Sequence, residues 1–236
     1  MSDMSESSNK IVTQKIHNEI VRFDYADFED LENNKSYDKF KVGSLNITTG
    51  KLVCTDPMYR ALGYPQSWTV NPGNYPVSIY IGLVGDFKGR VAYAEVIFSD
   101  EPPVKWEYSL ISDEYLSDDF EKMMNGTYPV ENGLSSFSDF EAWKSYNDKI
   151  KIFYSKNKEG NYYRDVLEPL FKANSNIPPS SRGEDWINFT IDEKSKANII
   201  MFGSGWGDGL YPRYVAYDKN GRPVKFITDF INQIKE

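Results

Sequence analysis

The chain has 236 residues, of which 40% are hydrophobic and 15% aromatic, and its formal net charge at pH 7 is −8. This length and this apolar content predict a folded globular protein and exclude a disordered one. The negative charge argues against sequence-independent binding of nucleic acid, which needs Lys and Arg side chains to displace counterions from phosphates.

Residues 1–39 are predicted to be a polar, partly disordered segment outside the main domain. The first ten residues are small and polar and lack the pattern of a signal peptide, so we expect disorder there and a cytoplasmic protein. Apolar residues spaced among charges after residue 10 predict a loosely docked segment with a short helix. No stretch approaches the roughly 18 apolar residues of a membrane span, so no membrane partner is expected.

Residues 40–111 are predicted to form antiparallel strands. Strands at residues 42–48 and 51–55 flank Thr49 and Gly50, a pair typical of a hairpin turn. Strict alternation of apolar residues over 77–83 predicts the next strand, and residues 90–98 return after a glycine turn. A strand at residues 104–110 completes the predicted meander.

Residues 112–174 change to a helical period and are predicted to be a helical insertion. The sequence from Ser138 to Glu141 matches a capping box, which marks the start of a helix. A second helix places Tyr163, Leu167 and Phe171 on one face, and Pro169 is expected to kink or restart it. The polar residues 174–183 are predicted to form a mobile loop.

The last third of the chain returns to strands, which we place at residues 186–191, 197–202, 211–217 and 222–228. Residues 218–221 are predicted to form a hairpin turn and residues 229–235 a short helix. Trp106 and Trp186 are embedded in strands and are expected in the core. The predicted fold is therefore α+β, with a mostly antiparallel sheet, a helical insertion and a C-terminal helix in one domain spanning residues 40–236.

A glycine-rich loop between two of these strands is the most informative motif. Glycines at positions 203, 205, 207 and 209 permit positive φ and close backbone approach, so the loop is a tight corner or the rim of a site. It lacks the residues of a P-loop, a dinucleotide fingerprint or a nucleophile elbow. The candidates for ligand binding are Ser204, Trp206, Asp208 and Tyr211, with Tyr75 and Tyr214 as further members of an aromatic rim.

Cysteine and histidine chemistry is nearly absent, because Cys54 and His17 are the single residues of their types. An intramolecular disulfide and the usual zinc sites are excluded, and a nucleophile paired with histidine is disfavoured. Cys54 is predicted to be a small buried strand residue.

Carboxylates supply the remaining candidate chemistry. Glu95 alternates with apolar residues on a strand, so it needs either a partner, such as Arg90 or Arg213, or a raised pKa. Asp208 lies between two glycines and suits either an Asx turn or a ligand role. The predicted ligands of a Ca²⁺ or Mg²⁺ site are Asp56, Glu95, Asp139 and Asp208.

At these residues the sequence resembles a bacterial family, the domain of unknown function 4241. The resemblance covers roughly residues 40–232 and rests on ordered blocks at residues 49–53, 56–57, 72–77, 90–96 and 204–212. The chain departs from the family pattern at Glu131, where Asp is usual. The resemblance implies the fold and the place of the site, and it implies no reaction.

Two functions remain open at this point, so catalysis is undecided. The first is a non-enzymatic interaction protein, such as an immunity or accessory factor, that binds a basic protein through the aromatic glycine loop and needs no cofactor. The second is a metal-assisted hydrolase or small-ligand-binding protein whose carboxylates converge near residues 203–209. The sequence predicts neither substrate, partner identity nor oligomeric state.

Overall fold

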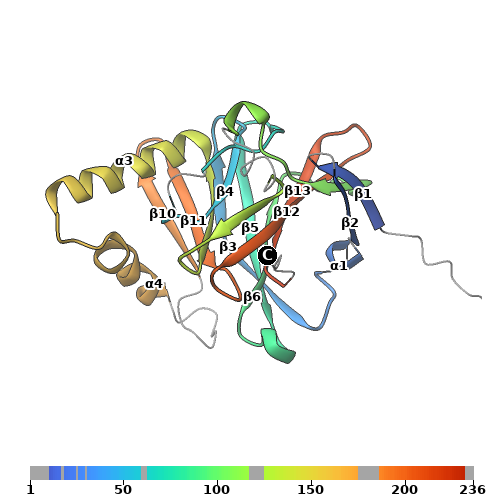
Figure 1. Ribbon diagram of the computed structural model, residues 1–236, viewed down its shortest axis with the longest axis horizontal. Coiled ribbons are helices and arrows are strands. Elements are labelled where there is room, and N and C mark those ends of the chain that lie inside the picture. Colours follow the sequence, from blue (N-terminus) through green and yellow to red (C-terminus); the bar gives the residue numbers. More distant parts are fainter. Residues whose placement is uncertain are drawn as a thin grey trace, which may run out of the picture.

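The structure is a computed structural model that describes residues 11–16, 19–24, 26–29, 31–59, 63–116, 125–174 and 186–231. Figure 1 shows two β-sheets at the centre of the molecule, with the long helix α3 and helix α4 on one side and a small N-terminal hairpin on the other. All pairs among the described strands are antiparallel. The predicted combination of mostly antiparallel sheet with helices is therefore confirmed.

The larger sheet brings together strands from both halves of the chain. Its order is β3 (Tyr37–Ile47), β5 (Gly73–Gly82), β6 (Val91–Ile97), β13 (Pro223–Asp229), β12 (Gly209–Tyr217) and β7 (Lys105–Tyr108). The short strand β8 (Thr127–Val130) pairs with the first half of β12. The predicted hairpins β5–β6 and β12–β13 are both present.

The smaller sheet has the order β10 (Trp186–Asp192), β11 (Ala197–Gly203), β9 (Leu134–Asp139) and β4 (Leu52–Thr55). The predicted hairpin between β3 and β4 is wrong, because β3 pairs with β5 and β4 pairs with β9. Every residue of β4 is buried, which suits a strand covered on both faces. The turn at Gly50 therefore carries the chain from one sheet to the other.

The predicted meander is correct for its first two strands and wrong for the third. β7 lies at the far edge of the sheet and pairs with β12. The place beside β6 is taken by β13, with Val96 opposite Phe226. β6 and β13 are thus separated in sequence by more than half of the chain, and local sequence patterns do not predict a pairing over that separation.

Among the described residues of the predicted insertion, the first α-helix begins at Phe140. Residues 113–115 form a 3₁₀ turn, η3 (Asp113–Tyr115), and residues 127–130 and 134–139 form β8 and β9. Helix α3 (Phe140–Lys156) follows directly, and the Asp139 carboxylate caps it by accepting a hydrogen bond from the N–H of Glu141. The predicted helix start is confirmed within two residues.

The second predicted helix is interrupted next to its proline. A π-helical turn η4 (Tyr163–Leu167) runs into α4 (Glu168–Asn174), in which Pro169 is the second residue. Proline has no N–H for the preceding turn, and the wider π geometry accommodates that missing bond. Leu167 and Phe171 are buried in the core cluster that packs against the smaller sheet, as their spacing predicts.

The N-terminal segment contains more structure than predicted. β1 (Ile11–Ile16) and β2 (Glu19–Asp24) form a hairpin, and α1 (Ala26–Glu29) follows. Phe28 and Leu31 are buried, and the ring of Phe28 contacts those of Trp106 and Tyr214. This segment thus contributes to a core cluster. The predictions for residues 1–10, His17, the loop up to residue 183 and the helix beyond Ile231 lie outside the described residues; Asp229 itself ends β13.

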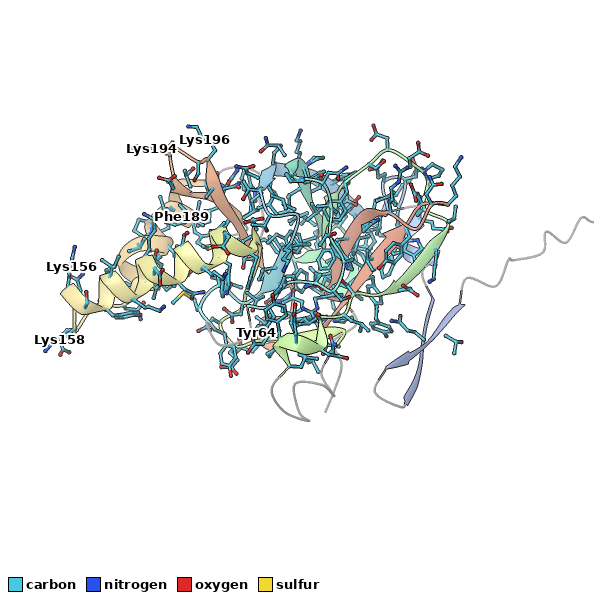
Figure 2. All side chains as sticks on the ribbon, turned by 90° about the horizontal axis from the view of Figure 1, so that it is seen from above. Tyr64, Lys156, Lys158, Phe189, Lys194 and Lys196 are labelled. Carbon is cyan, nitrogen blue, oxygen red and sulfur yellow. The ribbon has the colours of Figure 1, made fainter. Side chains whose placement is uncertain are left out.

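The main core lies between the two sheets, where the rings of Phe137, Phe202 and Phe226 meet. Cys54 and Trp106 are buried as predicted, and Trp186 packs half-buried at the edge of this core. Among the described helices, none combines the length and the apolar character that crossing a membrane requires. Figure 2 shows side chains filling the space between the sheets, with Lys156, Lys158, Lys194 and Lys196 projecting from the end formed by α3 and the β10–β11 turn.

Candidate functional site

The glycine-rich loop joins β11 to β12 and is closed by hydrogen bonds to one carbonyl. The hydroxyls of Ser204 and Tyr211 both donate to the carbonyl oxygen of Gly207, at 2.7 and 2.9 Å. The N–H of Gly207 in turn donates to the carbonyl of Ser204. Both side chains are buried, so their hydroxyl groups stabilise the loop conformation from the core side.

Two of the glycines have conformations that only glycine adopts readily. Gly205 has φ +56° and Gly207 has φ +96°. A Cβ on Gly205 would lie 2.6 Å from the carbonyl oxygen of Val91, whereas one on Gly207 would meet open space. Gly205 therefore lets the loop pack directly on β6, and Gly207 supplies the turn.

Trp206 is the aromatic side chain that this loop presents to solvent, and it remains 39% exposed. Its indole meets the ring of Phe87 edge to face at 4.5 Å, and the guanidinium of Arg90 lies 5.0 Å from the centre of the indole. Arg90 also donates to the carbonyl of Gly205 at 2.9 Å. The exposed indole is thus held in place by one aromatic ring and one cation.

Asp208 lies next to Trp206 and is exposed, with its carboxylate accepting a hydrogen bond from the N–H of Gly133 at 2.9 Å. This contact ties the loop to the β8–β9 turn. Tyr211 is buried, and burial, followed by the charge of Asp208, raises its pKa to about 12. Of the four predicted ligand-binding residues, Trp206 and Asp208 lie at the surface, while Ser204 and Tyr211 lie below them.

The two further tyrosines of the predicted rim do not surround this loop. Tyr214 is buried on the face of β12 opposite to Tyr211, because side chains alternate along a strand. Tyr75 is half-buried against Phe98. The aromatic surface of the loop therefore consists of Trp206 with Phe87 from the 3₁₀ turn η2 (Gly85–Phe87).

Asp56 and Asp139, which the sequence proposes as cation ligands, bind backbone N–H groups of neighbouring loops. Asp56 is buried and accepts from the N–H groups of Met58, Glu131 and Asn132, at 2.7 to 3.0 Å. Asp139 is also buried and accepts from the N–H groups of Thr48 and Thr49, besides capping α3. Each carboxylate therefore fastens a turn to the sheet.

Glu95 is fully buried on the outer face of the larger sheet, where it is paired. Its carboxylate lies 2.7 Å from the ammonium of Lys39 and 3.4 Å from that of Lys225, and it accepts from the hydroxyl of Tyr80 at 3.0 Å. Burial and then the charge of Glu95 raise the pKa of Tyr80. Glu95 thus has the ion-pair partners that its position demands, although they are not the predicted arginines.

The four predicted cation ligands do not form one site. Within the described part of the chain, no group of three or more carboxylate, imidazole or thiol side chains comes together in a way that could hold a metal ion. Asp56 and Asp208 bind consecutive residues of the β8–β9 turn, whereas Asp139 binds the turn at Thr48 and Thr49. Glu95 lies on the outer face of the larger sheet, beside Lys39 and Tyr80. The described residues therefore do not bring all four predicted ligands together near residues 203–209.

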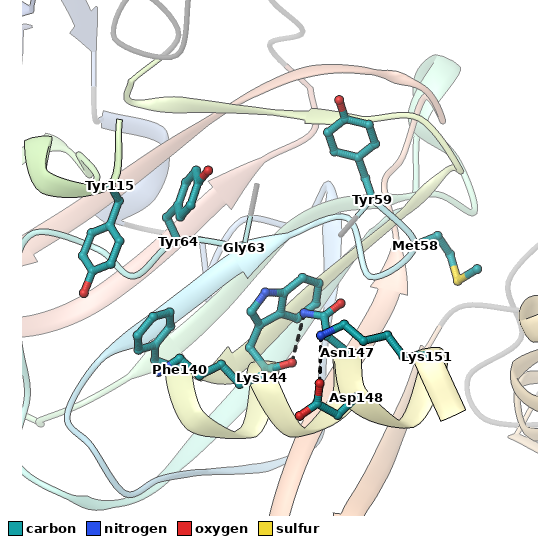
Figure 3. Close-up of a pocket in the computed structure, with 11 residues that line it drawn as sticks. Met58, Tyr59, Gly63, Tyr64, Tyr115, Phe140, Lys144, Asn147, Asp148 and Lys151 are labelled. Carbon is teal, nitrogen blue, oxygen red and sulfur yellow. Dashed lines mark hydrogen bonds and ion pairs between the residues drawn. The ribbon is translucent and has the colours of Figure 1, made fainter. Parts of the chain in front are cut away.

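A cleft of about 930 Å³ lies over the first half of α3, and the sequence analysis missed it (Figure 3). Five of its eleven lining residues are aromatic, and the polar and charged ones other than the tyrosines come from α3. The lining residues are Met58, Tyr59, Gly63, Tyr64, Tyr115, Phe140, Trp143, Lys144, Asn147, Asp148 and Lys151. The one sequence signal is polar Asn147 on the buried stripe of α3, whose Oδ1 is buried and has no hydrogen-bond partner among the described residues.

Comparison with known proteins places the chain in one family. The sequence model of a family described as Protein of unknown function (DUF4241) matches residues 45–228. No curated protein and no solved structure matches the chain. The matched residues run from β3 to β13 and so contain both sheets, the glycine-rich loop and the cleft.

Proposed function

The chain belongs to this DUF4241 family, and we propose that it is a non-enzymatic interaction protein that binds a basic partner around Trp206. The binding surface, called here the Trp206 surface, consists of the exposed side chains of Leu83, Val84, Asp86, Trp206 and Asp208. Such a protein would act as an immunity or accessory factor that blocks or carries its partner.

The observation that carries the proposal is the exposed, immobilised indole. Tryptophan is enriched among residues that dominate binding energies, and an exposed apolar cluster on a folded protein is typical of an interaction site. Because Phe87 and Arg90 already hold the Trp206 ring, little side-chain entropy is lost when a partner covers it. Leu83 and Val84, 39% and 58% exposed, extend the apolar area along the β5–β6 turn.

The charge of the molecule supports a basic partner. Asp86 and Asp208 contribute carboxylates to the Trp206 surface, and Glu131 is exposed in the turn that Asp208 contacts. Lys88, in the β5–β6 turn that also carries Asp86, is exposed and adds one positive charge nearby. The exposed lysines of the β10–β11 turn lie at the other end of β11 from the glycine-rich loop. The net charge of −8 also attracts a basic partner, at longer range.

A selection from a random peptide display library tests the proposal. Peptides are selected on the wild-type protein and then measured against Trp206→Ala and against Ile152→Ala, which removes another exposed large apolar side chain, on α3. We expect basic peptides whose affinity falls about tenfold in Trp206→Ala and changes little in Ile152→Ala. Enrichment of neutral or acidic peptides, or equal losses in both variants, would overturn the proposal.

Asp208→Asn separates the charge of the surface from its architecture. Asparagine keeps a side-chain oxygen that accepts from Gly133 N–H, so the loop should stay folded. We expect an unchanged melting temperature, weaker binding of the selected peptides and a smaller dependence of that binding on salt. Unfolding of this variant would instead assign Asp208 a structural role in the turn.

The cleft over α3 favours a second candidate function, the binding of a small planar anion. Its volume lies within the range of ligand sites, and its aromatic walls suit a planar ring. The ammonium of Lys51 lies 6.0 Å from the ring of Tyr115, and that of Lys144 lies 4.2 Å from Phe140. These cations at the aromatic wall favour an anionic group on the ligand.

The dye 8-anilinonaphthalene-1-sulfonate is a suitable probe because it combines planar rings with a sulfonate. We expect its fluorescence with the folded protein to fall in Lys144→Gln and to persist in Trp206→Ala, which alters the other exposed aromatic surface. Fluorescence that depends on Trp206 alone, or that is absent with the wild type, would remove this candidate.

A further inference from the structure

Arg213 occupies an unusual position for a charged residue, because it lies inside the core between the two sheets. It shares a face of β12 with Tyr211 and Val215, and its exposure is 0%. Its guanidinium lies 5.6 Å from the ring centre of Tyr128, a contact between a cation and an aromatic face. The backbone of Arg213 is fully used, since its N–H donates to Gly126 and its carbonyl accepts from Ser109.

The side chain of Arg213, by contrast, has no hydrogen-bond acceptor within the described part of the chain. Nε, Nη1 and Nη2 are all buried and all unpartnered. A guanidinium carries five N–H donors and keeps its proton in proteins. Burying such a cation without acceptors is among the costliest arrangements in a protein interior, so an acceptor is required.

The polar groups nearest in the fold already direct their protons elsewhere. Thr228 Oγ1 donates to the carbonyl of Pro212 and therefore accepts from the hydroxyl of Tyr128, at 2.9 Å. The Tyr128 oxygen then accepts from Ser135, at 2.7 Å. These hydroxyls form a chain without a net charge, so they do not neutralise the guanidinium.

The thiol of Cys54 does not supply the missing negative charge either. Burial raises its pKa to about 12, although the nearby charge of Arg213 acts in the opposite direction. At neutral pH the thiol is therefore protonated. A second buried donor, Nε2 of Gln66, also has no partner among the described residues, and Gln66 is joined through the Ser109 hydroxyl to the strand pair that carries Arg213. Donors thus exceed acceptors in this part of the core.

We propose that Arg213 is the centre of a buried binding site for a small monovalent anion of the halide class. One negative charge balances the single positive charge of the guanidinium, and a spherical anion accepts several N–H bonds at once. A neutral water molecule would accept hydrogen bonds but would leave the charge uncompensated in a medium of low dielectric constant. The complete burial of Arg213 restricts the site to a small occupant.

Thermal unfolding in different sodium salts tests the site. The wild type, Arg213→Met and Arg164→Met are compared in chloride, bromide and gluconate at one ionic strength; Arg164 is an exposed arginine paired with Asp165 and controls for lost charge. We expect a saturable rise of the wild-type melting temperature in chloride or bromide over gluconate, by roughly 5 °C at a hundredfold excess over Kd. Arg164→Met should behave like the wild type and Arg213→Met should show no dependence.

Equal melting temperatures of the wild type in chloride and gluconate would overturn the proposal, as would the same anion dependence in Arg213→Met. Wild-type crystals grown in bromide give a test that does not depend on the folding of a variant. We expect an anomalous scattering peak within hydrogen-bond distance of the Arg213 guanidinium. An ordered water or a protein oxygen at that place would show that the charge is balanced in another way.

Discussion

The carboxylate of Asp139 accepts hydrogen bonds from both the N–H and the hydroxyl of Thr49, at 2.8 and 2.6 Å, across 90 residues of sequence. The same carboxylate caps α3 through the N–H of Glu141. One buried side chain therefore connects the turn between the two sheets with the start of the long helix. Its function in the molecule is structural, which explains why a carboxylate occurs at the junction of a strand and a helix.

Replacement of Asp139 by alanine should be strongly destabilising. The variant loses the helix cap and leaves the N–H groups of Thr48 and Thr49 without their acceptor. Together these losses predict a decrease of about 3 kcal/mol in the free energy of unfolding. Urea denaturation followed by circular dichroism measures it, with Asp148→Ala on the exposed face of α3 as control. A loss below about 1 kcal/mol would contradict this assignment.

Alanine at the two glycines of the loop should have unequal effects. Gly207→Ala adds a Cβ in open space and suffers only from its positive φ, which predicts a loss of about 1 kcal/mol. Gly205→Ala has the same difficulty and in addition a clash with the Val91 carbonyl, so its loss should exceed about 2 kcal/mol. Denaturant melts of the two variants compare them directly, and equal losses would show that the loop is not packed on β6 as described.

Cys54 should be inert in the folded protein. Its burial and its pKa of about 12 leave almost no accessible thiolate at pH 8. Under native conditions, a thiol reagent such as 5,5′-dithiobis(2-nitrobenzoate) should therefore react with Cys54 no faster than the protein unfolds. In denaturant it should react fully and release one equivalent of thionitrobenzoate per chain. Rapid reaction under native conditions would place Cys54 at the surface and would contradict the core arrangement around Arg213.

Asp218 should make stability depend on acid pH. The backbone N–H of Arg222, then its guanidinium and the N–H of Asn220, lower the pKa of Asp218 to about 2. Because the folded pKa is lower than the unfolded value near 4, its contribution is present at neutral pH and is lost as the pH falls from about 4 to about 2. The difference in melting temperature between wild type and Asp218→Asn should shrink over that interval. A constant difference would contradict the shift.

The sequence predicts best those elements whose partners are local. β12 and β13 were predicted with their turn, because alternation and the Asn220–Gly221 pair specify a hairpin. β9 was missed because its serines interrupt any apolar period although they are buried. Two of their hydroxyls have partners on other strands: Ser136 donates to the carbonyl of Thr55, and Ser135 pairs with the hydroxyl of Tyr128.

Only the part of the candidate site that lies in one short stretch of sequence could be predicted. Trp206 and Asp208 were identified because glycines surround them in the sequence. The cleft over α3 was not, since its walls come from three segments that only the tertiary fold brings together. Arg213 was considered as a partner of Glu95, but strand alternation places the two side chains on opposite faces of their sheet.

The separation in sequence of β6 from β13, and of β4 from β9, has a consequence for synthesis on the ribosome. Neither sheet acquires its central pairs until late segments are available, because β6 waits for β13 and β9 waits for β11. Pairings of this range are slow to form and leave apolar strand surfaces uncovered in the meantime. A nascent chain ending before residue 186 would therefore lack β12 and β13 of the larger sheet and β10 and β11 of the smaller one, and its folding would depend on protection until these strands emerge.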